Sequence, residues 1–102
     1  MGIAHIPPNR VLSPKRNWVL VMVLVDEGEG GVALALGRWD GGPVLAIRWN
    51  GTPDRPIGNP QSRGLPTWFV ISVQFRQAIL DSLDLSRDKK VLVKSFFDEE
   101  KP

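Results

Sequence analysis

The chain has 102 residues, which suffices for one folded domain with a single core and is too short for two. Hydrophobic residues make up 42% and charged residues 24%, a composition that fits a globular protein and excludes a disordered one. The net charge of +2 gives no argument for nucleic acid, and the absence of cysteine excludes disulfides and thiolate metal sites.

The N-terminal segment, residues 1–16, contains three prolines and no sustained periodicity. We expect an extended arm that lies on the surface or is partly disordered. The basic pair Lys15 and Arg16 before an apolar run imitates a signal peptide, but the run is short, lacks a small-residue cleavage site and leads into acidic residues. We therefore expect a cytoplasmic protein without a membrane segment, and a reducing compartment suits a chain without cysteine.

Residues 17–25 form a continuous, Val-rich apolar stretch, which is typical of a strand covered on both faces. This strand should be central in the sheet, or covered by a helix or by a second protomer. A second strand is expected at residues 32–39. Its alternate residues Ala33, Ala35 and Gly37 share one face, and their small size indicates close packing there.

A turn at Asp40 to Gly42 precedes a third strand at residues 44–49. With a three-residue hairpin loop, Arg38 and Arg48 would share one face of the sheet. A two-residue loop would shift the register and separate the two arginines.

After a long loop we expect a fourth strand at 67–71, an amphipathic helix at 73–85 capped by Ser72, a last strand at 91–97 and a loose polar tail at 98–102. Residues 17–97 are thus predicted to form one α+β domain in the order β-β-β-loop-β-α-β. Its antiparallel sheet, strongly twisted or barrel-like, would have about five strands and one covering helix.

The loop at residues 51–66 is the first candidate for a working surface. Structureless loops of more than about 12–15 residues are functional or disordered, and the four prolines of this loop favour an ordered one. Trp49 and Trp68 flank the loop and could anchor both ends. The loop is either a recognition element or an ordered connection that seals one end of the sheet.

Four arginines, Arg38, Arg48, Arg55 and Arg63, could converge on an anion, because guanidinium groups bind phosphate oxygens in pairs. Nearby carboxylates could pair with them instead. The tryptophans would add stacking surface for single-stranded nucleic acid if they were exposed, and would belong to the core otherwise.

Enzymatic chemistry has little support, since the only histidine, His5, lies in the proline-containing arm. We predict no metal and no cofactor. Metal-independent cleavage of RNA remains as an alternative, with Ser62 and Arg63 as its candidate residues.

Two blocks stand out, GRWDGGPVLAIRWNG at residues 37–51 and GNPQSRGLPTWFVI at residues 58–71. This pair of blocks resembles a family of small, uncharacterised bacterial proteins, some of them among mobile accessory genes such as integron cassettes. The resemblance implies no activity and no catalytic residue. It draws attention to residues 59–64, whose Asn-Pro-Gln-Ser-Arg-Gly string is not one that fold alone would select.

The sequence favours a small binding module, a homodimer through its apolar sheet, whose 51–66 loop holds a protein or an anionic ligand. The candidate binding residues are Arg38, Arg48, Trp49, Arg55, Asn59, Gln61, Ser62, Arg63, Gly64 and Trp68. The alternatives are a nucleic-acid-binding protein, a toxin-like ribonuclease, and a structural subunit that only mediates oligomerisation.

Overall fold

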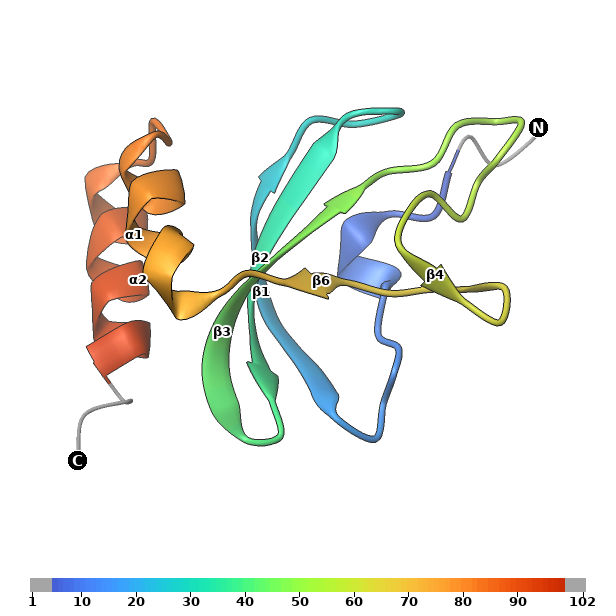
Figure 1. Cartoon of the computed structure of the whole chain (residues 1–102). Coiled ribbons are helices and arrows are strands. Elements are labelled where there is room, and N and C mark those ends of the chain that lie inside the picture. The colour runs from blue at the N-terminus through green and yellow to red at the C-terminus, as the bar shows by residue number, and fades with distance from the viewer. Residues whose placement is uncertain (1–4, 99–102) are drawn as a thin grey trace.

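The main sheet of the protein has four antiparallel strands in the order β1-β2-β3-β6. The computed structural model describes residues 5–98. The strands are β1 (Trp18–Asp26), β2 (Val32–Trp39), β3 (Gly42–Trp49) and β6 (Phe69–Val70), and a separate two-stranded sheet consists of β4 (Gln61–Ser62) and β5 (Leu65–Pro66). A short 3-10 turn, η1 (Pro8–Arg10), precedes the sheet, and two helices, α1 (Val73–Asp81) and α2 (Arg87–Asp98), follow it. In Figure 1 the helices lie on one side of the sheet, while η1 and β4 lie on the other.

The α+β class and the antiparallel sheet are confirmed, but the sheet is open, with β1 and β6 at its edges. The barrel-like arrangement and the fifth strand were therefore wrong. Among residues 5–98, two helices cover the sheet in place of the one expected.

The missing strand is the segment expected at residues 91–97, which forms most of helix α2. Its valines and phenylalanines have high strand propensity, yet strict alternation would mix Lys94 with Phe96 on one face and Ser95 with Phe97 on the other. Helical spacing instead buries Val93 and Phe96 together. The Ser86 hydroxyl accepts a hydrogen bond from the backbone N–H of Lys89 at 3.3 Å, the helix-start signal that indicates a helix here.

The β2–β3 hairpin has a two-residue turn, in contrast to the three-residue loop that we expected. Asp40 and Gly41 both have positive φ, 51° and 87°, as in the turns that match the twist of paired strands. In this register Arg38 is paired with Pro43, and Arg48 is paired with Ala33. The two arginines consequently point to opposite faces of the sheet.

Strand β1 lies at the edge of the sheet, so the expectation of a central position was wrong. Its pairing with β2 is interrupted by two bulges, one between Leu20 and Met22 and one between Val23 and Val25. The side chains of Val19 and Val21 are 59% and 47% exposed. The continuous apolar run is therefore an edge strand, and the side chains of Val19 and Val21 are not covered within the single chain.

The larger core lies between the sheet and the helices. Leu34, Leu36 and Leu45 of the sheet pack with Val93 and Phe96 of α2. Helix α1 is shorter than the predicted segment 73–85 and contributes only half-buried side chains to this core, such as Ile79 and Leu80.

The smaller core lies on the opposite face, where the sheet carries small residues. Trp18 lies directly over Gly37, and the indoles of Trp18 and Trp68 are 6.0 Å apart between ring centroids. Val11 is fully buried beside them, and its carbonyl oxygen accepts a hydrogen bond of 2.8 Å from Trp68 Nε1. Within residues 5–16, Pro8 and Val11 are buried and connect this segment to the smaller core, while most of its other residues are exposed or half-buried. Residues 1–4 and the predicted tail beyond Asp98 lie outside the described residues.

Neither helix of residues 5–98 has the length and apolarity needed to cross a membrane.

We expect Gly37→Ala to lower the free energy of unfolding by about 2 kcal/mol, because overpacking a core costs roughly 1–3 kcal/mol. An added Cβ would lie 2.0 Å from Trp18 Cη2. Gly42→Ala is the matched control, since the nearest atom to its Cβ would be 3.7 Å away. Denaturant unfolding measures both variants, and equal midpoints would show that Trp18 can move aside.

Candidate functional site

The 51–66 segment is an ordered connection that ends in a small hairpin. Strands β4 and β5 pair Gln61 with Pro66 and Ser62 with Leu65. Arg63 and Gly64 form the turn between them with φ of 52° and 79°. Gln61, Ser62, Arg63 and Gly64 are all exposed, so the structure brings these four candidate residues together at the tip of one hairpin.

Arg48 fixes the position of this connection. Its side chain is only 2% exposed, and its guanidinium donates hydrogen bonds to three backbone carbonyls, those of Ile57, Pro60 and Thr67. It also lies 6.0 Å from the centre of the Trp68 ring. A single side chain of β3 thereby joins two points in the middle of the loop to the residue that follows it.

Within residues 5–98 no carboxylate pairs with Arg48, and desolvation by burial lowers the pKa of its guanidinium. Arginine nevertheless stays protonated at neutral pH, so the loop carbonyls solvate a buried cation. Gly58 is necessary beside it, because its φ is 71° and an added Cβ would lie 2.6 Å from Arg48 Nη2.

The chain next to Arg48 is held at two further points. Trp49 and Asn59 exchange backbone hydrogen bonds of 2.7 and 3.1 Å, which bring Asn59 to the end of β3. The buried side chain of Asn50 donates from Nδ2 to Asp26 Oδ1 at 2.9 Å and to the carbonyl of Gly28 at 2.8 Å. The end of β3 is therefore tied both to the loop and to the β1–β2 turn.

A groove of about 470 Å³ lies where the loop meets the sheet. Residues paired across antiparallel strands point to the same face, and Val32 with Trp49, and Ile47 with Phe69, are such pairs. These side chains continue the face that the helices cover at Leu34, Leu36 and Leu45. The remaining walls come from Arg48, Asn59 and Pro60. We call this feature the aromatic groove.

The aromatic groove exposes two large aromatic side chains. Trp49 is 58% exposed and Phe69 is 63% exposed, in contrast to Trp68, which is only 6% exposed. The expected anchoring of the loop by both tryptophans thus holds for Trp68 alone. Trp68 belongs to the core, and Trp49 is free to contact a partner.

The four arginines do not converge. Arg38 lies on the helical side, 5.1 Å from the centre of the Phe96 ring, while Arg48 is buried on the opposite face. Arg55 and Arg63 are exposed on different turns of the loop. The register of the β2–β3 hairpin removes the shared face on which the arginine pair depended.

Sequence reasoning missed Phe69, Pro60, Ile47 and Val32 as parts of one surface. A signal was present in the Trp68-Phe69 pair, because adjacent residues of a strand point to opposite faces. If Trp68 enters the core, Phe69 must face away from it. The location of the groove depends on the pairing of β6 with β3, which no local pattern specifies.

The ribonuclease candidates Ser62 and Arg63 lie at the exposed hairpin tip. Within residues 5–98, no group of three or more His, Asp or Glu side chains is placed to hold a metal ion.

Comparison with protein-family models, curated proteins and solved structures finds no match to this chain.

We expect Arg48→Lys to lower the free energy of unfolding by roughly 3 kcal/mol. A lysine cannot reach all three carbonyls, and each lost hydrogen bond to a charged group costs about 1.5–3 kcal/mol. Amide hydrogen exchange should also become faster across residues 57–67.

Arg63→Lys is the matched control for Arg48→Lys, because it replaces an exposed arginine of the same loop and should change stability by less than about 0.5 kcal/mol. Equal stability of the two variants would show that the prolines and the backbone contacts hold the loop without Arg48.

Proposed function

We propose that this protein is a small protein-binding module whose aromatic groove holds an extended, proline-containing or aliphatic segment of a partner protein. The exposure of Trp49 and Phe69, which both line an apolar groove that also contains Pro60, is the observation that carries this proposal.

Aromatic side chains in such a position favour a polypeptide partner. Grooves lined by aromatic residues bind extended proline-rich segments, which lose little conformational entropy on binding. Exposing two large aromatic rings in one groove has no benefit for folding, whereas a partner would bury them.

The charges around the groove favour an uncharged segment over an anion or a nucleic acid. Arg48 is the only cationic residue among the lining residues, and its guanidinium is already bonded to loop carbonyls. Phosphate groups require accessible cations along their path.

Preorganisation supports the same function. Arg48 and the Trp49–Asn59 backbone pair fix one wall of the groove before any partner arrives. Binding to a rigid surface avoids the entropy cost of ordering a loop. The exposed residues Gln61, Ser62 and Arg63 follow the groove residues Asn59 and Pro60 in the chain, so they are the first candidates for polar contacts that give specificity for a particular partner.

A peptide-display selection against the full chain should return extended sequences rich in proline and aliphatic residues. For a selected peptide, Trp49→Ala and Phe69→Ala should each weaken binding at least about tenfold, because buried aromatic anchors contribute 2 kcal/mol or more. Titration calorimetry measures the affinity, and denaturant unfolding verifies that the variants remain folded.

Phe75→Ala provides the matched control for these variants, since Phe75 is 57% exposed but lies on α1, outside the groove. Its affinity should equal that of the unchanged chain. Binding of single-stranded oligonucleotides that depends on Trp49 and Phe69, with no peptide selected, would replace this proposal by the nucleic-acid alternative.

A second candidate function is self-association through β1. Residues 18–25 contain no charged residue or proline, the features that usually protect an edge strand, and they expose Val19 and Val21. The two bulges in the pairing with β2 make the backbone of β1 irregular, so contact through these valine side chains is favoured over a continuous strand ladder.

If β1 mediates a dimer, Val21→Lys should convert it to monomer, because burying an unpaired ammonium group in an apolar interface is costly. Sedimentation equilibrium measures the mass. Val73→Lys on α1, where the native valine is 66% exposed, is the control and should leave the mass unchanged. An unchanged chain that is monomeric at every accessible concentration would exclude this candidate.

A further inference from the structure

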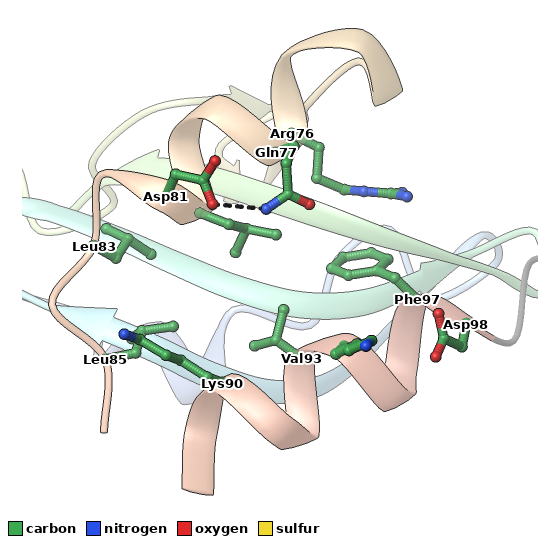
Figure 2. Close-up of a pocket in the computed structure, with 11 residues that line it drawn as sticks. Arg76, Gln77, Asp81, Leu83, Leu85, Lys90, Val93, Phe97 and Asp98 are labelled. Carbon is green, nitrogen blue, oxygen red and sulfur yellow. Dashed lines mark hydrogen bonds between the residues drawn. The ribbon is translucent and has the colours of Figure 1, made fainter. Parts of the chain in front are cut away.

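A second groove, separate from the aromatic groove, lies between the two helices (Figure 2). Its volume is about 740 Å³, within the range of about 300–1,000 Å³ that is usual for small-molecule sites. Side chains of α1, of α2 and of the connection between them form its walls. We call it the interhelical groove.

The floor of the interhelical groove is apolar. It is formed by Leu80 of α1, by Leu83 and Leu85 of the connection, and by Val93 and Phe97 of α2. The helices do not close over these side chains, since no residue of α1 is fully buried. At one end the guanidinium of Arg76 lies 3.9 Å from the centre of the Phe97 ring, and at the other end the chain turns through Leu83 and Leu85.

Helix α2 presents a mixed stripe to this groove. Lys90, Val93, Lys94 and Phe97 follow the spacing i, i+3, i+4, i+7, which places all four on one helical face. Among residues 5–98, neither lysine forms an ion pair. Two like charges one turn apart repel each other, and here they border an apolar floor.

The acidic residues of the groove are already engaged. Asp81 accepts a hydrogen bond of 2.8 Å from Gln77 Nε2 on the α1 wall, as the dashed line in Figure 2 shows. Asp98 and Arg76 are each engaged in a further polar or ring contact, so neither is without a partner. Because Gln77 is neutral, Asp81 keeps its negative charge on the α1 wall, and the uncompensated positive charges of the groove are the two ammonium groups of α2.

We infer that the interhelical groove binds a small amphipathic carboxylate, with its apolar chain on the leucine floor and its carboxylate between Lys90 and Lys94. An aliphatic chain would bury the open floor, and the anion would neutralise the repelling pair. This inference is independent of the aromatic groove and of the peptide partner proposed for it.

The test is titration of the full chain with decanoate below its micellar concentration, followed by amide NMR shifts. Decanoate should shift resonances of residues 76–98 and bind more tightly than decanol, which has the same chain without the charge. The double variant Lys90→Gln, Lys94→Gln should bind decanoate about tenfold more weakly, since two partly exposed charge contacts are lost. Added salt should weaken decanoate binding and leave decanol binding unchanged.

Arg87→Gln is the matched control, because Arg87 is an exposed cation of α2 outside the groove. It should bind decanoate as the unchanged chain does. The inference is overturned if decanol binds as tightly as decanoate, if the double variant retains full affinity, or if the shifts centre on Trp49 and Phe69.

Discussion

The fold depends on one buried cation. Arg48 extends from β3 into the interior, where burial opposes its charge and no carboxylate of the described residues compensates it. The carbonyls of Ile57, Pro60 and Thr67 take that role, so the loop must pass around the guanidinium for the arginine to be tolerated. The same contacts bring β6 to β3 and Pro60 to the sheet. The aromatic groove forms where β6, β3 and Pro60 come together.

The two faces of the sheet differ in side-chain size, and this difference decides what can pack on each. On one face Ala33, Ala35 and Gly37 leave room for the indoles of Trp18 and Trp68 and for Val11 of the N-terminal segment. On the other face leucines contact the helices. The helices leave the end of this second face uncovered, where Trp49 and Phe69 are exposed. The uncovered part of a core face has become the candidate binding surface.

The two grooves lie on separate parts of the molecule and differ in their charges. The aromatic groove has one cation, which is already bonded to loop carbonyls. The interhelical groove has two lysines that form no ion pair with any residue in the described part of the chain. An extended polypeptide fits the first arrangement and a small amphipathic anion fits the second. The two grooves can both form in a chain of this size because they use different elements. The sheet and the loop line the aromatic groove, and the two helices line the interhelical groove.

The sequence by itself determined the α+β class and the first three strands, and it indicated that the proline-rich loop is ordered. Alternation, turn residues and proline density are local signals, so each of them can be read without the tertiary structure. It also indicated Trp49 and Asn59, which meet at the groove. Only the tertiary structure decided that residues 91–97 are helical, because burial of Val93 and Phe96 outweighs strand propensity. The hairpin register placed Arg38 and Arg48 on opposite faces, and a one-residue difference in turn length has that effect on every side chain of a strand. The role of Arg48 as an internal support depends on contacts up to 19 residues away in the chain, which no local pattern contains.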